Sequence, residues 1–107
     1  MNDKTRGFLG LAMKAGKLAV GDGRATEQIR RDKAYLIIVS CDASKNTQKK
    51  YENMSNFREL PKITLDIDRY EFGGILGRDA AVVAAVCDRG FAEGILSRET
   101  AAERVDE

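Results

Sequence analysis

The stretch Tyr35-Leu36-Ile37-Ile38-Val39-Ser40-Cys41 decides the fold class of this chain. It is a continuous run of aliphatic, β-branched and aromatic residues, which is typical of a strand covered on both faces. A second apolar run, residues 81–86, has the same character. Two such strands among segments with helical spacing predict a central sheet that helices cover on both sides.

Working outward from these runs, helical spacing and capping residues predict strands and helices in strict alternation. In the first part of the chain we expect a helix at 4–15 ended by Gly16, a strand at 18–20, a polar helix at 24–32 anchored by Ala25 and Ile29, and the strand at 35–41. A helix capped by Ser44 follows and ends near Phe57, with an apolar stripe of Tyr51, Met54 and Phe57. After it we expect a strand at 62–65, a helix from Asp68 to near Gly77, the strand at 81–86, and a helix capped by Asp88 that ends near Leu96. This order predicts an α/β domain with a mixed or largely parallel sheet.

The length of 107 residues allows one domain with a substantial core and not two. We expect that domain over residues 1–96, followed by a charged tail, residues 97–107, that frays. The longest apolar run, residues 80–87, is too short to span a membrane, and the amino terminus has no secretion-signal pattern. A cytoplasmic protein without a membrane partner is expected.

Enzymatic residue combinations are largely missing. The chain has no histidine, and its two cysteines, Cys41 and Cys87, are too far apart in sequence for a Cys-x-x-Cys motif. We interpret both as reduced core thiols, and we predict no metal site, no cofactor and no catalytic residue. Four aspartates stand at strand-to-helix turns, where helix capping explains them: Asp42, Asp66, Asp68 and Asp88.

The net charge of +1 hides a division between the two halves of the chain. Residues 1–50 contain 11 Lys and Arg against 5 Asp and Glu, whereas residues 51–107 contain 7 against 12. Because a partner responds to the local field, the basic half favours an anionic partner.

The turn Gly21-Asp22-Gly23 follows a short strand and precedes the polar helix. It lacks the third glycine of a dinucleotide-binding loop, since Thr26 occupies that position, and it lacks a P-loop ending. A helix amino terminus attracts phosphate through its free N–H groups. The candidate nucleic-acid-binding residues share this region or flank it: Lys17, Gly21, Gly23, Arg24, Gln28, Arg30 and Arg31.

A second glycine turn, residues 73–79, precedes the last predicted strand and contains Arg78. In an alternating fold it can lie beside the first turn, at one end of the sheet. Arg78 therefore joins the candidate residues.

Several segments, taken in order, resemble the YlxQ-type bacterial proteins of the L-seven-Ae ribosomal-protein superfamily, which binds kink-turn RNA. The resemblance covers roughly residues 6–96, and these segments carry it: LGLAMKAGK at 9–17, AYLIIVS at 34–40, DASKNTQKK at 42–50, LGRD at 76–79 and VAAVCDRGFA at 83–92. It implies a three-layer α/β/α sandwich around a four-stranded mixed sheet.

The resemblance also implies where RNA would bind. Family members that bind kink-turns carry a Gly-x-Asn-Glu motif that reads sheared G·A pairs, and an apolar loop before the last strand that covers a protruding nucleotide. The glycine matches Gly21, whereas Gly23 and Arg24 replace the Asn-Glu pair. Glu27 replaces the following basic residue, and the apolar loop falls on Arg78-Asp79-Ala80. Backbone recognition of RNA is therefore favoured over strict kink-turn specificity.

We predict a non-enzymatic, monomeric RNA-binding protein whose partner is structured RNA, with ribosomal RNA as one candidate and no DNA expected. Two alternatives stay open. One is a protein-interaction module that has kept the fold and lost RNA, which the missing Asn-Glu pair favours. The other is a small nucleotide-binding enzyme, which the absence of histidine and of a complete phosphate motif disfavours.

Overall fold

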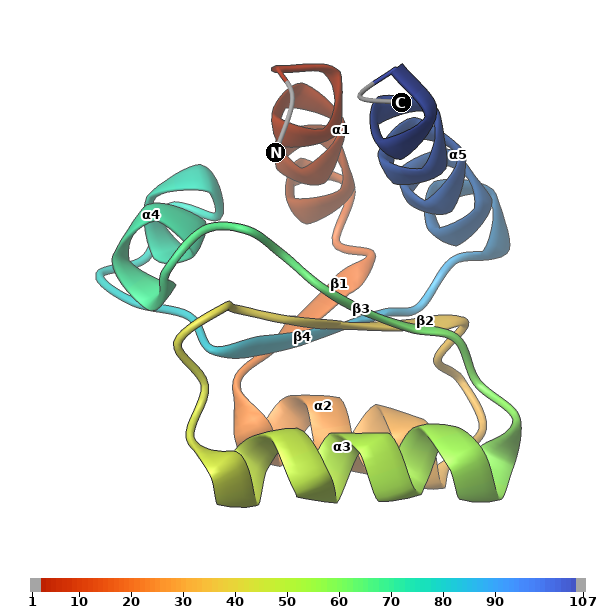
Figure 1. Cartoon of the computed structure of the whole chain (residues 1–107). Helices are drawn as coiled ribbons and strands as arrows, with labels where there is room; N and C mark the ends of the chain where they lie inside the picture. The colour runs from red at the N-terminus through yellow and green to blue at the C-terminus, as the bar shows by residue number, and fades with distance from the viewer. Residues whose placement is uncertain (1–2, 106–107) are drawn as a thin grey trace.

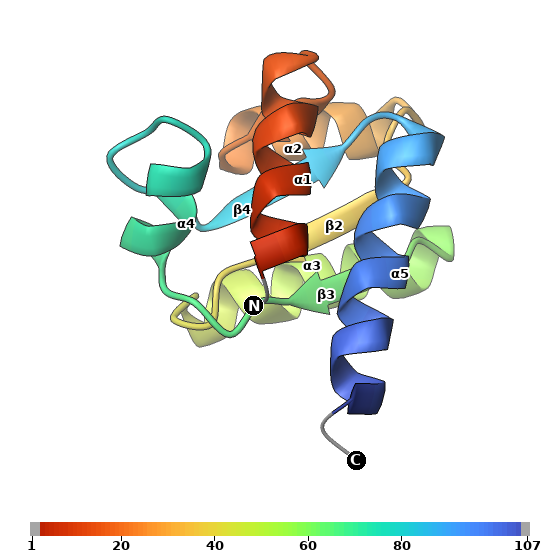
Figure 2. The ribbon, with the colours of Figure 1, turned by 90° about the horizontal axis from the view of Figure 1, so that it is seen from above.

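Helices and strands alternate along residues 3–105, the part of the chain that the computed structural model describes; side chains are described for residues 3–99. The elements are α1 (Asp3–Lys14), β1 (Leu18–Val20), α2 (Asp22–Arg30), β2 (Leu36–Val39), α3 (Lys45–Arg58), β3 (Lys62–Thr64), α4 (Arg69–Ile75), β4 (Val83–Val86) and α5 (Arg89–Val105). Helices α1, α4 and α5 cover one face of the sheet, and α2 and α3 cover the other (Figure 1). Seen from above, α1 lies between α5 and α4 and packs beside α5 (Figure 2), and an ion pair between Arg6 and Glu71 joins α1 to α4.

The sheet is mixed, with the strand order β1-β4-β2-β3. Strand β4 pairs antiparallel with both β1 and β2, whereas β2 and β3 are parallel. Strands β1, β2 and β3 therefore end at one edge of the sheet, where β4 begins. The predicted three-layer α/β/α sandwich with a four-stranded mixed sheet is confirmed.

Strand β2 shows why the continuous apolar run lies at the centre of the sheet. Leu36 and Ile38 belong to the core under α1, α4 and α5, and Ile37 and Val39 belong to the core over α2 and α3. All four are fully buried. Because successive side chains of a strand point to opposite faces, a strand between two cores needs apolar residues at every position.

Three predicted capping residues begin their helices as expected. The Ser44 hydroxyl accepts a hydrogen bond from the Thr47 N–H, and the Asp68 carboxylate accepts from the N–H groups of Tyr70 and Glu71. The Asp88 carboxylate accepts from the Phe91 N–H. These caps bind donors that the first turn of a helix otherwise leaves without partners.

Two expectations about helix ends differ from the structure. Helix α2 begins at Asp22 rather than near residue 24, so Gly23 is inside the first turn. Helix α5 continues past Leu96 to Val105. Arg98 supports this extension, since its guanidinium lies 3.9 Å from the centre of the Phe8 ring and donates to the Gly94 carbonyl. The division at residue 96 stays a prediction, and residues 106 and 107 of the proposed tail lie outside the described residues.

Two expectations about burial were wrong. Phe57 is 84% exposed, so the apolar stripe of α3 consists of buried Tyr51 and half-buried Met54. Cys41 is exposed in the loop after β2, where its N–H donates to the Ile67 carbonyl. Cys87 is half-buried, and burial raises the pKa of its thiol. The prediction of a core thiol at Cys41 was therefore wrong, because the chain has already left the buried strand at this residue.

Candidate nucleic-acid interface

Three loops meet where β1 and β2 end and β4 begins. The Gly21 N–H donates to the Val83 carbonyl over 2.9 Å, and the Ser40 N–H donates to the Val82 carbonyl over 2.8 Å. Helices α2 and α3 both begin at this edge (Figure 1). We call residues 20–24, 40–45 and 77–83 the site edge. The opposite edge of the sheet contains Lys17, where β1 begins, and the starts of β2 and β3.

Gly21 makes the turn from β1 into α2 possible. Its φ of +97° and ψ of 160° lie in a region that side chains of L-residues rarely allow, so the turn requires glycine. Gly21 also gives α2 no side-chain cap, and the first intrahelical bond runs from the Ala25 N–H to the Gly21 carbonyl. The N–H groups of the first turn are therefore available to solvent or to an anion.

Gly23 is exposed within that first turn, and a Cβ atom built there meets nothing within 4 Å. The sequence had indicated a turn residue, whereas the backbone at Gly23 is helical. Its effect is to leave the start of α2 uncovered. A phosphate that approaches the amide groups therefore meets no side chain at position 23.

The predicted basic face of α2 opens onto two hollows. Arg24 and Gln28 line a hollow of about 350 Å³ beside the edge strand β1, together with Leu18 and Cys87. Lys17 adjoins this hollow through its neighbour Gly16, although Lys17 itself is at the opposite edge, where its carbonyl accepts from the Cys87 N–H.

Arg30 and Arg31 line the second hollow, of about 450 Å³, between α2 and α3. Glu27 lines both hollows, and its carboxylate pairs with the Arg31 guanidinium over 3.0 Å. The face is thus less basic than the count of arginines suggested. Arg24 and Gln28 lie nearer β1, and Arg30 and Arg31 nearer α3.

Arg78 is exposed on a loop that packs tightly against α4. Its N–H donates to the Gly73 carbonyl over 2.8 Å, and the Ala81 N–H donates to the Arg69 carbonyl over 2.9 Å. A Cβ atom at Gly73 would lie 2.6 Å from the Cα of Ala80, closer than real side chains allow. The loop is therefore held in place, and it brings Arg78 to the same edge as Gly21, as the spacing predicted.

A polar network that sequence reasoning missed fixes the start of α2. The buried Tyr51 hydroxyl donates to the Asp22 carboxylate over 2.5 Å and lies 3.2 Å from the Thr26 hydroxyl. The Lys50 ammonium contacts both Asp22 oxygens, at 2.8 and 3.0 Å. Hydrogen bonds from Lys50 and then Tyr51 lower the pKa of Asp22, and burial together with Asp22 raises the pKa of Tyr51. The carboxylate nearest the first turn of α2 is therefore neutralised by Lys50.

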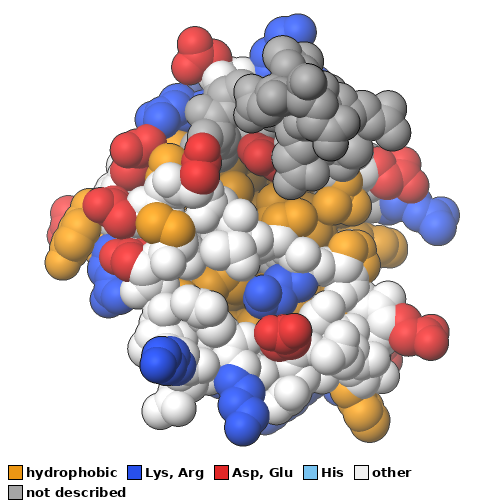
Figure 3. Space-filling model, viewed as in Figure 1, with side chains coloured by type: hydrophobic (Ala, Val, Ile, Leu, Met, Phe, Trp, Pro, Cys, Tyr) orange, Lys and Arg blue, Asp and Glu red, His pale blue; other side chains and the backbone are white. Residues whose placement is uncertain are grey.

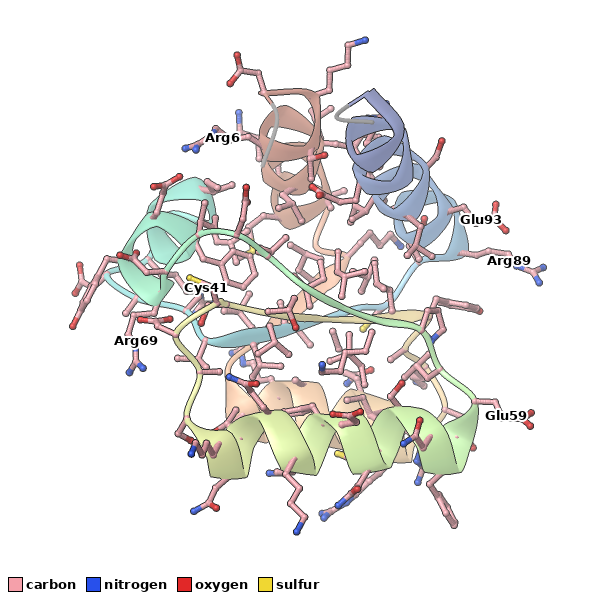
Figure 4. All side chains as sticks on the ribbon, in the orientation of Figure 1. Arg6, Cys41, Glu59, Arg69, Arg89 and Glu93 are labelled. Carbon is pink, nitrogen blue, oxygen red and sulfur yellow. The ribbon has the colours of Figure 1, made fainter. Side chains whose placement is uncertain are left out.

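A second ion pair joins the loop after β2 to α4. The Arg69 guanidinium donates to an Asp42 carboxylate oxygen and to the Asp42 carbonyl, each over 2.9 Å, and the Arg69 N–H donates to the other carboxylate oxygen. Desolvation alone would raise the pKa of Asp42, but hydrogen bonds from Ser40 and Arg69 outweigh it and lower that pKa. Figure 4 shows Arg69 and Cys41 at this edge, with Glu59 and Arg89 at the other.

Helix α3 adds basic residues that the sequence analysis had not selected. Lys45 and Lys49 are exposed near its start. In the sequence, only their place in segment 42–50, which carries part of the family resemblance, pointed to them. On the face seen in Figure 3, basic side chains in the lower part stand apart from one another, among uncharged and acidic ones, and form no continuous patch. Discrete cations spaced along a surface suit separate phosphates better than a single compact anion.

The described residues contain no cluster of three or more histidine, cysteine, aspartate or glutamate side chains that could hold a metal ion. Among residues 3–105, no helix is long and apolar enough to cross a bilayer. The site edge offers backbone donors and three basic side chains, Arg24, Lys45 and Arg78, among three acidic ones, Asp22, Asp42 and Asp79. Lys50 and Arg69, which lie outside these ranges, pair with Asp22 and Asp42.

The fold corresponds to a known class of protein. The model of the ribosomal protein L7Ae/L30e/S12e/Gadd45 family matches residues 3–95, so the chain belongs to that family. Within it, the chain is of the YlxQ type: over 90 residues it is 37% identical to the RNA-binding protein YlxQ of Bacillus subtilis and 38% identical to the RNA-binding protein YlxQ of Enterococcus faecium. The matches cover 84% of this chain and 89% and 85% of those relatives.

Solved structures agree with this placement. A protein of unknown function from Bacillus halodurans superposes with a TM-score of 0.85 at 27% identity, over 90% of this chain and 96% of that one. The 15.5kD RNA binding protein of Giardia lamblia superposes with a TM-score of 0.72 at 14% identity, over 91% and 86% of the two chains. The second likeness shows the shared fold.

Proposed function

We propose that this protein binds structured RNA through the site edge, as a non-enzymatic, monomeric and cytoplasmic protein. The first turn of α2 supplies backbone N–H donors, Arg24 of the same turn supplies one positive charge, and Arg78 of the loop before β4 supplies another. Gln28, Arg30 and Arg31 extend the surface along α2, and Lys17 borders it at the far end of β1. Ribosomal RNA is a candidate partner, because both YlxQ relatives are RNA-binding proteins in a family of ribosomal proteins.

One observation carries the proposal: the uncapped start of α2 lies beside the Arg78 loop, with the Gly21 N–H bonded to the Val83 carbonyl at the end of that loop. Phosphate oxygens are the acceptors that helix amino termini and arginines bind together. The Lys50 ammonium offsets the negative charge of Asp22 in that turn.

The residues at the site edge favour recognition of the RNA backbone over kink-turn readout. Gly23 has no side chain and Arg24 has only donors, so neither supplies the acceptors that an Asn-Glu pair offers to base edges. Glu27 stands where a basic residue would contact phosphate. We therefore expect at most a tenfold preference for a kink-turn, about 1.4 kcal/mol, the scale of one good base contact.

Salt dependence tests the electrostatic part of the proposal. With about four to six phosphate contacts, the logarithm of the affinity for structured RNA should fall against the logarithm of salt concentration with a slope of roughly −3 to −5. The measurement is a filter-binding titration with a kink-turn RNA, the same RNA with its G·A pairs replaced, and free nucleotides.

Each alternative function predicts a different result in this titration. A slope near zero, or no binding to either RNA, contradicts the proposal and favours a protein-interaction module. Tight binding of free nucleotides favours a nucleotide-binding enzyme. A preference for the intact kink-turn far above tenfold contradicts the backbone mode.

A further inference from the structure

The outward face of α3 contains a furrow that is separate from the two hollows beside α2. Its volume is about 340 Å³, and every residue that lines it belongs to α3. The lining side chains form two rows in which residues are four positions apart, and such rows make ridges with a groove between them. One row consists of Lys45, Lys49 and Asn53, and the other of Gln48, Glu52 and Asn56. We call this groove the α3 furrow, and the helix rises about 17 Å along it.

Two asparagines of the furrow have no role within the domain. Asn53 is exposed in the interior of α3 and Asn56 in its last turn, where asparagine is a poorer helix former than alanine. Among the described residues, neither side-chain amide has a hydrogen-bond partner, and neither caps the helix. Their donors and acceptors are therefore available to a ligand.

The charges of the furrow are also available. Lys45, Lys49 and Glu52 are exposed, and none of them forms an ion pair within residues 3–99. The neighbouring Lys50, in contrast, is taken by Asp22. Two ammonium groups one turn apart suit neighbouring phosphates, whereas a carboxylate and two amides suit hydroxyl groups, which both donate and accept hydrogen bonds.

The furrow begins at the site edge. Lys45 is the last residue of the segment 40–45, and the Gln48 amide donates to the Ala43 carbonyl of that segment over 2.7 Å. Figure 4 shows side chains along α3 that project away from the sheet. A chain of phosphates and sugars that contacts the site edge can therefore continue along α3 without leaving the protein surface.

We propose that the α3 furrow binds the sugar–phosphate backbone of RNA that extends from the site edge, and that it selects ribose over deoxyribose. This inference rests on the proposed function and adds a second contact surface to it. Lys45 and Lys49 contact phosphates. Glu52 accepts a hydrogen bond from a 2′-hydroxyl group, and the two asparagines exchange hydrogen bonds with its neighbours. The 2′-hydroxyl is the group by which a protein distinguishes RNA from DNA.

The test compares a long-stemmed RNA hairpin with the same hairpin in which 2′-fluoro groups replace the stem hydroxyls. Such sugars keep the RNA helix geometry but cannot donate a hydrogen bond. The parent protein should bind the ribose form about tenfold more tightly, the effect of one or two net hydrogen bonds. Asn53→Ala with Asn56→Ala should reduce this preference to less than about threefold. Both substitutions favour the helix, so the fold is not at risk.

Matched variants separate the furrow from the rest of the surface. Asn46→Ala removes an exposed amide of the same helix that does not line the furrow, and it should keep the full preference for ribose. Lys49→Ala should weaken binding of both hairpins about fivefold and make the salt slope shallower by about 1, as loss of one phosphate contact does. Lys62→Ala, at the opposite edge, should leave that slope unchanged.

The outcomes distinguish this inference from the proposed function. If the parent binds both hairpins equally well, or if the double asparagine variant keeps the full preference for ribose, the inference is overturned while RNA binding at the site edge stands. If the parent binds neither hairpin, the inference fails together with the proposed function.

Discussion

Replacing Arg24 and Arg78 together by alanine is expected to weaken binding of structured RNA about thirtyfold, ~2 kcal/mol. Arg24 belongs to the first turn of α2, and Arg78 is on the loop before β4, whose end is bonded to Gly21. Each charge-assisted contact to an exposed phosphate is worth about 1 kcal/mol or somewhat more. Equilibrium titration against one RNA at one salt concentration measures the change.

The matched control removes the same charge from the opposite edge. Lys62 begins β3, and Arg89 begins α5 after the end of β4. Both are therefore far from the site edge, and Figure 4 shows Arg89 on that side. Lys62→Ala with Arg89→Ala should change the affinity less than about threefold, through net charge alone. Equal losses for the two double variants would show that position does not matter and would refute the site edge.

Gly73→Ala is expected to lower the free energy of unfolding by about 2 kcal/mol, the usual cost of overfilling a packed position. The added Cβ would lie 2.6 Å from the Ala80 Cα, and both groups are backbone or directly attached to it, so the loop must move. Because the displaced loop contains Arg78, RNA affinity should fall as well. Chemical denaturation and the RNA titration measure the two effects separately.

Gly74→Ala is the matched control in the same helix. Gly74 is exposed and a Cβ there has open space, so the substitution should stabilise the protein slightly, by up to about 1 kcal/mol through helix propensity. If Gly73→Ala is as stable as Gly74→Ala, the loop before β4 is not held by close packing. The rigid placement of Arg78 would then be wrong.

Much of the fold could be predicted because local and global signals agree. The run at residues 36–39 is apolar at every position, which a strand between two cores requires, and β2 is that strand. Ser44, Asp68 and Asp88 each precede a helix and bind its first N–H groups. Each of these signals lies within a few consecutive residues, so it can be recognised in the amino-acid sequence alone.

Other features depended on contacts between distant segments. The start of α2 was misplaced because two glycines suggest a turn, whereas Tyr51 and Lys50 of α3 hold Asp22 in helical position from about thirty residues away. No local pattern reveals that partnership. Helical spacing likewise put Phe57 on the apolar face of α3, but in the last turn of that helix nothing buries its side chain, which is 84% exposed.

The candidate site was predictable in outline and not in its charges. Alternation brought the turns at Gly21 and Arg78 to one edge, as expected. The count of basic residues did not show that Arg31 pairs with Glu27, or that Arg30 and Arg31 open toward α3 while Arg24 opens toward β1. Ion pairs and the direction in which a side chain points can be seen only once the side chains are placed in the structure.

The most direct test of RNA binding at the site edge is the change in backbone amide chemical shifts when structured RNA is added to the protein. The largest changes should fall on residues 21–24 and 77–80, which form the proposed interface at the start of α2 and in the Arg78 loop. Tyr35 and Lys62, at the opposite edge, should change little. Largest changes at the opposite edge or along α5, with residues 21–24 unaffected, would contradict the account.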